Sequence, residues 1–489
     1  MGASFGKVLQ AHAEGAAAAA GPAISYPGES LSWVDLEART AARARRLIAL
    51  GVKPDDFVGI ALPNGIEHHV SSFAAWRAGA TPCILPIKLP GSELAQIITL
   101  ANPRVLIRDS GAPIAGVTQI PPDASDAAVD LPPDLAAADW KAVASGGSTG
   151  RPKLIVDHGA AVLDERLEGI MALVGMPYGG VMLNPGPLFH NAPFLFTNLA
   201  LLAGTRIVGM GRFDPEEALR LIERERVEWV CMVPTMMHRI WNLPSEVRAR
   251  YDLSSLRKVV HMAAACPPWL KRAWIEWLGP DRILEVYAGT EGASLLIGGE
   301  EWLRKPGSVG KAPPEALSVR DEAGEICPPG TVGEIFFTAE AATRFHYIGA
   351  EPRLDAAGRL SLGDLGYLDE DGYLFLSDRR TDLIIRGGAN IYPAEVEAAL
   401  IEHPAIRDAV VLGLPCDEYG ARVHAIIERD AEISLDDIES FVLERLTGYK
   451  RPTSYEFIDT PLRDEAGKVR RAALREERLE WLSQGIIFN

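Results

Sequence analysis

Short apolar runs alternate with helical patterns through the first part of this chain, and this alternation constrains the fold more than any other feature. Segment 34–50 is rich in Ala, Arg and Leu at helical spacing, and the apolar run 57–62 follows it. Comparable apolar runs lie at 82–86, 104–107, 206–209, 229–233 and 258–262. Strands that alternate with helices favour parallel sheets covered by helices. Because ligands of such sheets gather at the carboxyl ends of the strands, the loops after these runs are candidate site segments.

The later part of the chain has two further patterns. Pro-Gly and Asp-Gly turns separate short strand-like pieces, which indicates a β-rich subdomain at about 307–376. Beyond it, the order is helix, strand, strand, helix, at 394–401, 409–412, 423–427 and 435–446. We predict an α/β protein. A large N-terminal domain (1–380) has parallel-rich sheets flanked by helices and includes the β-rich subdomain, and a small α+β C-terminal domain covers 381–489.

Composition excludes several classes of protein. The net charge of −17 argues against nucleic acid or an anionic membrane as the main partner. No apolar run is long enough to span a bilayer. The five cysteines are scattered and show no C-x-x-C spacing, which indicates reduced thiols rather than a disulfide framework or a zinc site. We expect a cytoplasmic protein, and the sequence leaves the oligomeric state open.

Segment 145–153, Ser-Gly-Gly-Ser-Thr-Gly-Arg-Pro-Lys, places glycines, hydroxyls and two cations in one short loop. Glycines let backbone N–H groups approach an anion closely, and hydroxyls and cations help to hold it. The loop is not a Walker A motif, because Pro152 precedes Lys153 and Leu154 follows it. Taken alone, a triphosphate-binding loop and an ordinary surface turn explain this segment equally well.

Four further segments, in order, change that balance: Tyr-Ala-Gly-Thr-Glu-Gly at 287–292, Ser-Leu-Gly-Asp-Leu-Gly-Tyr at 361–367, the stretch 378–397, and Gly-Lys-Val-Arg at 467–470. Together with the loop they resemble the motifs of the adenylate-forming (ANL) superfamily, in its acyl-CoA synthetase or acid–CoA ligase branch. The chain departs from the family pattern at Gly146, Ala288 and Ala466, and at Thr381, where the hinge of the family usually has Asp or Lys.

The resemblance implies a reaction in two steps. A carboxylate attacks the α-phosphorus of ATP, which gives an acyl-adenylate and pyrophosphate, and a thiol then displaces AMP. The small C-terminal domain of the family rotates between the steps, so we expect it to be mobile. The resemblance therefore implies ATP, Mg²⁺ and CoA as cofactors and a small-molecule carboxylic acid as substrate.

The resemblance also implies a role for each residue that matches a motif. Those expected at the phosphates of ATP are Ser148, Thr149, Gly150, Lys153 and Thr290, and Glu291 is expected to hold Mg²⁺. Those expected at the nucleoside are Ala264 and Tyr287 at the adenine and Asp364 and Arg379 at the ribose. Lys468 is expected to catalyse the first step with Thr290 and Glu291, because an ammonium neutralises the charge between the carboxylate and the α-phosphate.

Several of these assignments have an ordinary structural alternative: Arg379 suits a surface ion pair, and Ala264 suits core packing. Thr290-Glu291 suits the start of a helix, where Thr caps the first turn and Glu favours the dipole. Asp364 suits a turn, because glycines lie close on either side. Lys468 suits a solvated lysine in a basic tail.

The acceptor and acid sites complete the expectations. Gly387 and Gly388 would let the pantetheine arm pass closely, and Lys450 would contact the phosphates of CoA. Those expected in the acid pocket are His190, Asn191, Met236, Met237 and Ala263. For His190, a place in the core is an alternative. These residue types suit an adaptable, mainly apolar pocket.

The expected activity is that of an ATP-dependent acid–CoA ligase. The F-D-x-S context typical of amino-acid-activating members is missing, which favours an acid without an α-amine. Segment 187–193 resembles that of ligases for bulky ring or steroid-type acids, and a fatty acid is a further possibility. Two alternatives stay open: a stand-alone adenylation enzyme that loads a carrier protein, and a non-catalytic nucleotide-binding scaffold.

Overall fold

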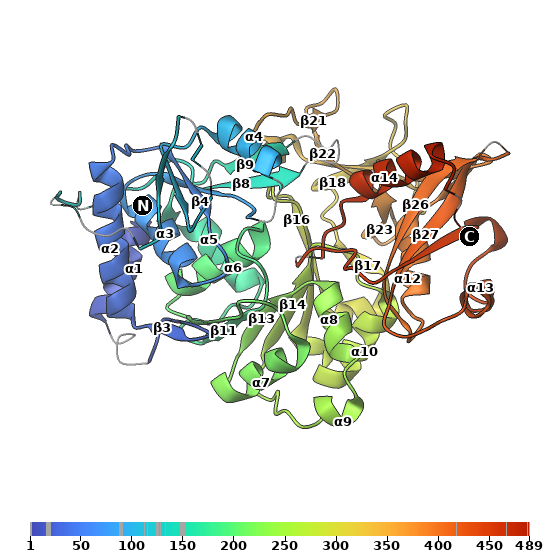
Figure 1. Cartoon of the computed structure of the whole chain (residues 1–489), viewed down its shortest axis with the longest axis horizontal. Coiled ribbons are helices and arrows are strands. Elements are labelled where there is room, and N and C mark those ends of the chain that lie inside the picture. Colours follow the sequence, from blue (N-terminus) through green and yellow to red (C-terminus); the bar gives the residue numbers. More distant parts are fainter. Residues whose placement is uncertain are drawn as a thin grey trace.

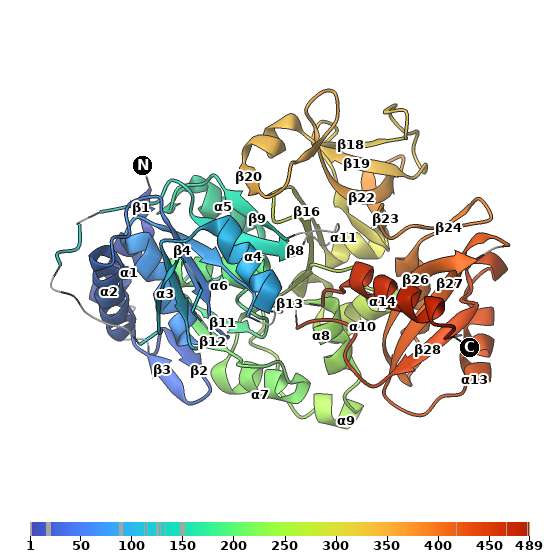
Figure 2. The same cartoon turned by 45° about the horizontal axis from the view of Figure 1, so that its top comes forward.

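The computed structural model describes residues 2–15, 21–87, 91–111, 113–114, 116–123, 127, 129–132, 134–146, 152–416, 418–465, 467–486 and 488. Figures 1 and 2 show the N-terminal half (blue and green) on one side of the molecule and the C-terminal segment (orange and red) on the other, with the yellow strands between them. Within the described residues, no helix is both long enough and apolar enough to cross a membrane.

Two mixed sheets form the N-terminal part. In spatial order, the eight-stranded sheet contains β16 (Ser294–Gly298), β15 (Ile283–Ala288), β14 (Lys258–Met262), β13 (Trp229–Met232), β11 (Val181–Asn184), β12 (Arg206–Gly209), β2 (Ile24–Tyr26) and β3 (Glu29–Leu31). The seven-stranded sheet contains β20 (Phe345–Ile348), β9 (Pro152–Asp157), β8 (Lys141–Gly146), β5 (Thr81–Ile84), β4 (Phe57–Ala61), β6 (Val105–Arg108) and β7 (Thr118–Ile120). Most inner strands of both sheets run parallel, as the alternation of strands and helices predicts. The exception is β9, which is antiparallel to its neighbours β8 and β20.

Helices cover these sheets and fill the space between them. They are α1 (Phe5–Glu14), α2 (Trp33–Ala49), α3 (Ile66–Arg77), α4 (Gly91–Ala101), α5 (Glu165–Leu173), α6 (Asn191–Leu202), α7 (Pro215–Glu225), α8 (Pro234–Trp241), α9 (Ser245–Arg248), α10 (Pro268–Leu278) and α11 (Gly299–Arg304). α3 and α6 are buried around nearly their whole circumference, as expected of helices in the interior. A small ribbon of β1 (Ala3–Ser4) and β10 (Val162–Leu163) closes the N-terminal edge.

The main core lies where α1, α3 and α6 meet. Trp76 is 1% exposed, and its ring centroid lies 4.9 Å from that of Phe5 and 5.1 Å from that of Phe73. The Trp76 indole N–H donates to the carbonyl of Trp140 at 2.6 Å, so its polar group is satisfied inside the core. This packing gives the two sheets a rigid base for the loops at their carboxyl edges.

The β-rich subdomain is an antiparallel sheet. Its strands are β17 (Ser308–Lys311), β23 (Tyr373–Arg379), β22 (Leu360–Leu368), β19 (Gly333–Phe337), β18 (Leu317–Arg320) and the short β21 (Arg353–Leu354), which pairs with β22. A β-rich subdomain is therefore present, and β23 continues to Arg379, directly before the C-terminal segment.

The C-terminal segment has a hairpin, a three-stranded sheet and three helices. These are β24 (Ile384–Arg386), β25 (Ala389–Ile391), α12 (Pro393–Leu400), β26 (Ile406–Cys416), β27 (Gly420–Arg429), α13 (Leu435–Leu443), β28 (Ser454–Ile458) and α14 (Arg471–Ser483). The α/β fold class, with a large N-terminal part and a small α+β unit, is confirmed. The sequence pattern did not predict α14, because its Arg- and Glu-rich composition suggests a solvated tail.

Candidate active site

The loops after β14 and β15, at the carboxyl edge of the eight-stranded sheet, form one wall of the site. Tyr287 is the second-last residue of β15, and Thr290 and Glu291 lie in the turn that leads to β16. No helix begins at Thr290, so the explanation of this pair as a helix start is wrong. Instead, the backbone N–H of Gly289 bonds to the carbonyl of Ala293 at 3.1 Å and closes a tight turn that presents both side chains.

Glu291 is held by a hydroxyl and a cation. Its Oε1 accepts a hydrogen bond of 2.6 Å from the hydroxyl of Tyr347 and lies 3.7 Å from Nζ of Lys153. The Lys153 ammonium also lies 3.7 Å from the centre of the Tyr347 ring. Burial lowers the pKa of Lys153, and the charge of Glu291 opposes that effect. The expected phosphate-binding lysine and the expected metal ligand therefore lie together.

Tyr347 is a site residue that sequence reasoning missed. It lies on β20, whose antiparallel register with β9 pairs Tyr347 with Ile155. Lys153, two residues earlier on β9, therefore lies close to it. No motif marks Tyr347, because its contact with Glu291 joins residues that are 56 positions apart.

A second cluster surrounds Asp364 on β22. Its Oδ2 accepts a 2.7 Å hydrogen bond from the hydroxyl of Tyr287, and its Oδ1 lies 3.3 Å from Nε of Arg379. Asp364 and Arg379 are register partners on β22 and β23, which explains their proximity. Burial raises the pKa of Asp364, whereas Arg379 and the hydrogen bond from Tyr287 lower it. Asp364 therefore lies in a paired strand, and the explanation of it as a simple turn residue is wrong.

The phosphate-binding loop itself falls partly outside the described residues. Ser148, Thr149 and Gly150 belong to that part, so their predicted role stays a prediction. The flanking strands β8 and β9 are described and pair in antiparallel register, so that Lys153 faces Ser145.

Lys468 reaches the same region from the C-terminal segment. Its backbone N–H bonds to Oδ1 of Asp464 at 2.9 Å, and Oδ2 of Asp464 lies 3.3 Å from Nε2 of His190. Desolvation by the surrounding protein lowers the pKa of Lys468, although the residue remains accessible to water. The charge of Arg379 lowers this pKa further, whereas those of Asp464 and Glu291 raise it. A Cβ on the neighbouring glycine, 467, would lie 3.2 Å from a side-chain atom of the N-terminal part. The loop is therefore docked, and Lys468 is not in a free basic tail.

The residues expected in the acid pocket come from three elements. His190 and Asn191 lie at the start of α6, Met236 and Met237 are buried in α8, and Ala263 follows β14 with a φ of 75°. Burial lowers the pKa of His190, and its contact with Asp464 opposes that effect. Asn191 Oδ1 is buried and has no hydrogen-bond partner among the described atoms, so a polar acceptor is available near the start of α6.

Asn64 holds the loop before His190 and is a positioning residue that the sequence did not mark. Its side-chain amide donates to the carbonyls of Gly186 at 2.9 Å and Met210 at 3.2 Å, and its Oδ1 accepts from the N–H of Leu188 at 2.7 Å. Asn64 follows β4 of the seven-stranded sheet, so these bonds fix the loop between the two large sheets.

The residues expected at the thiol acceptor lie apart from these clusters. Gly387 and Gly388 form the turn of the hairpin β24–β25, with φ of 56° and 83°, a region that suits glycine. Lys450 Nζ lies 2.7 Å from both carboxylate oxygens of Glu395. Among the described contacts, none joins these three residues to Asp364, Glu291 or Lys468.

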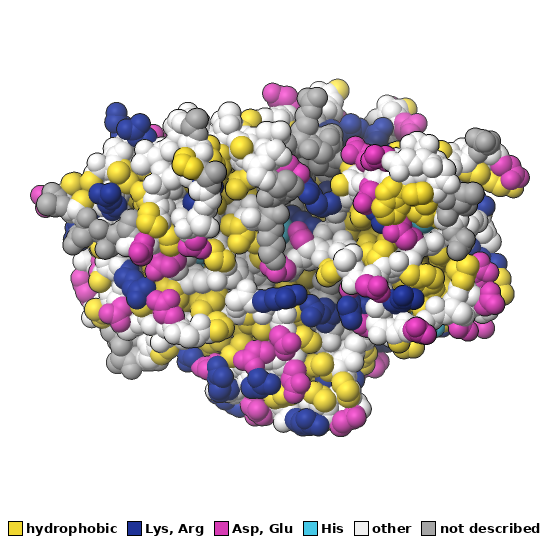
Figure 3. Space-filling view, in the orientation of Figure 1, with side chains coloured by type: hydrophobic (Ala, Val, Ile, Leu, Met, Phe, Trp, Pro, Cys, Tyr) yellow, Lys and Arg dark blue, Asp and Glu magenta, His cyan; other side chains and the backbone are white. Residues whose placement is uncertain are grey.

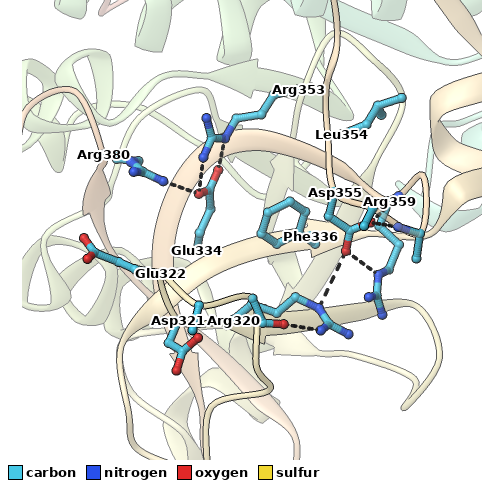
Figure 4. A pocket seen from close by; sticks show the side chains of 14 residues that line it. Arg320, Asp321, Glu322, Glu334, Phe336, Arg353, Leu354, Asp355, Arg359 and Arg380 are labelled. Carbon is cyan, nitrogen blue, oxygen red and sulfur yellow. Dashed lines mark hydrogen bonds and ion pairs between the residues drawn. The ribbon is translucent and has the colours of Figure 1, made fainter.

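Thr381 lies between two anchored neighbours. Figure 4 shows Arg380 and Arg353 pointing at the carboxylate of Glu334, which borders a cavity of about 560 Å³ in the β-rich subdomain. Arg380 Nη1 lies 2.7 Å from Oε2 of Glu334, whereas Asp382 accepts a 2.9 Å bond from Nε of Arg471 in the C-terminal segment. The exposed Thr381 therefore lies between a residue bound to the β-rich subdomain and a residue bound to α14.

Figure 3 shows Lys and Arg side chains gathered where the C-terminal segment meets the rest of the molecule. On a chain with a net charge of −17, such local positive charge suits an anionic ligand. Glu291 is the carboxylate expected to hold Mg²⁺, and no group of three or more His, Cys, Asp or Glu that could hold a metal occurs in the described part of the chain. This fits Mg²⁺, which is commonly held by one or two carboxylates together with water and substrate phosphates.

Comparison with known proteins shows the family of this chain. The family described as AMP-binding enzyme matches residues 10–345, and its C-terminal domain matches 395–468. Feruloyl-CoA synthase from Amycolatopsis sp is 32% identical, over 93% of this chain and 95% of the relative. The long-chain-fatty-acid–CoA ligase FadD13 of Mycobacterium tuberculosis (29%, 91% and 93%) and the fatty acid–[acyl-carrier-protein] ligase ScoC of Streptomyces coeruleorubidus (29%, 93% and 93%) are also similar.

Among solved structures, o-succinylbenzoate CoA synthetase from Bacillus subtilis, in complex with its acyl-adenylate intermediate, aligns with a TM-score of 0.81. It is 25% identical, and the alignment covers 96% of this chain and 97% of that one. The chain therefore belongs to the family of AMP-binding enzymes. It is an acid–thiol ligase of the AMP-forming acyl-CoA synthetase type, and its cofactors are ATP, Mg²⁺ and CoA.

Proposed function

We propose that this protein is an ATP-dependent ligase that joins a bulky, hydrophobic carboxylic acid without an α-amine to CoA. The observation that carries the proposal is that the loop of Lys468, from the C-terminal segment, contacts His190 through Asp464, and that the charges of Glu291 and Arg379 act on Lys468. The similarity to feruloyl-CoA and o-succinylbenzoate-CoA synthetases, both named for ring-containing acids, supports a ring-type acid over a short linear one. The mainly apolar residues near His190 agree with this choice.

In the first step, the protein brings two anions together. Asp364, oriented by Tyr287 and Arg379, accepts hydrogen bonds from the ribose hydroxyls and fixes the nucleoside. Lys153 neutralises the outer phosphates, and Glu291 holds Mg²⁺, which supplies further positive charge at the phosphates when bound. Lys468 places its ammonium between the attacking carboxylate and the α-phosphate, where negative charge must be neutralised as the new bond forms and pyrophosphate leaves.

In the second step, a thiol replaces the nucleotide. The C-terminal domain, which we place at 381–489, turns about Thr381 and carries Lys468 away from Glu291 and Arg379. Gly387 and Gly388 then line the path of the pantetheine arm, whose sulfur attacks the acyl carbon and releases AMP. Lys450 would exchange its partner Glu395 for a phosphate of CoA. The five cysteines are all unpaired, which supports the proposed cytoplasmic location.

A carrier-protein acceptor is the second candidate, because a fatty acid–[acyl-carrier-protein] ligase is among the similar proteins. The two acceptors are separated by incubating the enzyme with ATP, Mg²⁺, CoA and a panel of fatty, aryl, alicyclic and steroid acids, and by detecting thioesters by mass spectrometry. A CoA thioester is the expected result. Pyrophosphate release without a CoA thioester would point to a carrier protein, and the absence of both products with every acid would support a non-catalytic scaffold.

The proposed role of Lys468 has its own test. Lys468→Ala should lose most acyl-adenylate formation yet keep much of the thioester formation from supplied acyl-adenylate, since only the first step needs the ammonium. Lys311→Ala, which removes an exposed lysine of β17, is the matched control and should leave both steps unchanged. Equal loss of both steps in Lys468→Ala would contradict the assignment.

A further inference from the structure

The loop that carries Lys468 is fixed at both ends to one buried carboxylate. Arg463 precedes the loop and Arg471 follows it as the first residue of α14. Nη2 of Arg463 lies 3.3 Å from Oε2 of Glu397, and the guanidinium of Arg471 bonds to both oxygens of the same carboxylate. Glu397 therefore joins two arginines that are separated in sequence only by the residues of the loop.

Glu397 is itself rigidly placed. It lies on α12, its side chain is 8% exposed, and its Oε1 accepts a 2.8 Å hydrogen bond from the backbone N–H of Val411 on β26. Burial alone would raise its pKa, but Arg471 and Arg463 outweigh that effect and hold the pKa of Glu397 below its ordinary value. The carboxylate is therefore charged at neutral pH and fully committed to these partners.

The two arginines connect Glu397 to the loop and to the neighbouring strand β26. Arg463 bonds to Asp408 through Nε, at 2.9 Å, and donates through Nη1 to the carbonyl of Gly467, the residue before Lys468, at 3.3 Å. Arg471 donates to the carbonyl of Val411 at 2.9 Å. A planar guanidinium can serve several acceptors at once in fixed directions, which a lysine cannot do. The position of Lys468 therefore depends on Glu397, although the two side chains do not touch.

The loop is also closed internally. The N–H of Asp464 bonds to the carbonyl of Lys468 at 2.9 Å, and the N–H of Gly467 bonds to the carbonyl of Asp464 at 2.9 Å. The loop is thus a small rigid turn whose orientation is set at its base, and a displacement of the base moves the ammonium at its tip. A misplacement of about 1 Å at a reacting centre can lower a rate by about a hundredfold.

We propose that Glu397 is a positioning residue for acyl-adenylate formation, which it supports by holding Arg463 and Arg471 and thereby aiming Lys468. The inference rests on the proposed first-step role of Lys468. In Glu397→Gln the shape is kept, but the amide carries no charge and its NH₂ group faces the two guanidinium groups as a second donor. The base of the loop then loses its common anchor. The hairpin turn of Gly387 and Gly388 and the pair of Lys450 with Glu395 do not involve Glu397 and are kept.

The test measures the two half-reactions separately in Glu397→Gln. We expect acyl-adenylate formation to fall at least about tenfold and thioester formation from supplied acyl-adenylate to change less than about threefold. Glu402→Gln is the matched control, because Glu402 lies just after α12, near Glu397 in sequence, but forms a solvent-exposed pair with Arg445 at 3.0 Å. It should leave both steps unchanged.

A double variant separates positioning from general stability. If Glu397 acts through Lys468, Glu397→Gln should add little further loss of acyl-adenylate formation to Lys468→Ala. Additive losses, or equal losses in both half-reactions, would overturn the inference. If Lys468→Ala alone keeps its acyl-adenylate formation, the proposed function of Lys468 fails instead. Should Glu397→Gln not fold, Arg463→Lys, which retains the charge, must show the same selective loss of the first step; if it does not, the inference is wrong.

Discussion

The hydroxyl of Tyr287 offers a sharp test of the nucleotide site. It donates a 2.7 Å hydrogen bond to Asp364, whose side chain is 13% exposed, and the other described partner, Arg379, lies at 3.3 Å and is 60% exposed. Hydrogen bonds to charged groups contribute about 1.5–3 kcal/mol. Because Asp364 retains Arg379, we expect a value near the lower limit. Tyr287→Phe, which keeps the ring, should therefore lower kcat/KM for ATP by about ten- to thirtyfold.

The pH dependence adds a second readout. The hydrogen bond from Tyr287 lowers the pKa of Asp364, so the loss of this bond should raise that pKa further. As the pH falls, the variant should therefore lose activity at a higher pH than the native enzyme does. Both effects are measured by following the release of AMP that requires the carboxylic acid substrate, at varied ATP concentration and at varied pH. Tyr373→Phe is the control, because it removes a similar 2.8 Å bond, to Glu301, elsewhere. If Tyr287→Phe matches this control in kcat/KM and in pH profile, the assignment of Asp364 to the ribose is refuted.

Three further changes have defined outcomes. Glu291→Gln should raise the Mg²⁺ concentration for half-maximal activity about tenfold, since an amide is a poorer ligand than a carboxylate; an unchanged Mg²⁺ titration would exclude Glu291 as the ligand. Burial raises the pKa of Asp378 to about 6 from 3.8, so the stability that its neutral form contributes is present below pH 3.8 and is lost as the pH rises through about 6. In urea unfolding, the free energy of unfolding of Asp378→Asn should therefore rise relative to that of the native protein by up to about 3 kcal/mol as the pH increases from about 4 to 7. A difference between the two proteins that stays constant with pH would contradict this. Trp76→Ala should cost about 3–5 kcal/mol of unfolding free energy, and a loss below about 1 kcal/mol would show that the aromatic core is not tightly packed.

The sequence predicts those parts of the site that are local in the chain. Apolar runs followed by loops locate β4, β13 and β14, because a buried parallel strand needs a continuous apolar segment. Asp364 and Glu291 are recognisable because each lies in a short motif. The structure brings their two segments together, because Tyr287, from the segment of Glu291, bonds to Asp364, and the separation of the two motifs in sequence does not show this.

The contacts that orient these residues are not predictable in the same way. Tyr347 reaches Glu291 only through the register of β20 on β9, and Glu397 meets Arg463 only after α12, β26 and α14 have packed. The motif also leaves open which arginine after Lys468 matters. The structure shows that Arg470 is exposed and pairs with Glu93, whereas Arg471 is the one bound to Glu397. Such pairings depend on tertiary structure, for which single-sequence patterns carry no signal.

The central claim is that a carboxylate attacks the α-phosphorus of ATP before the thiol enters. It is tested most directly by supplying the acid with a heavy oxygen isotope in its carboxylate, together with ATP, Mg²⁺ and CoA, and by weighing the nucleotide product. The account predicts that AMP gains one heavy oxygen atom per turnover, because the carboxylate oxygen stays on the α-phosphate when the thiol displaces AMP. Heavy oxygen found in inorganic phosphate instead, with ADP as the nucleotide product, would contradict it.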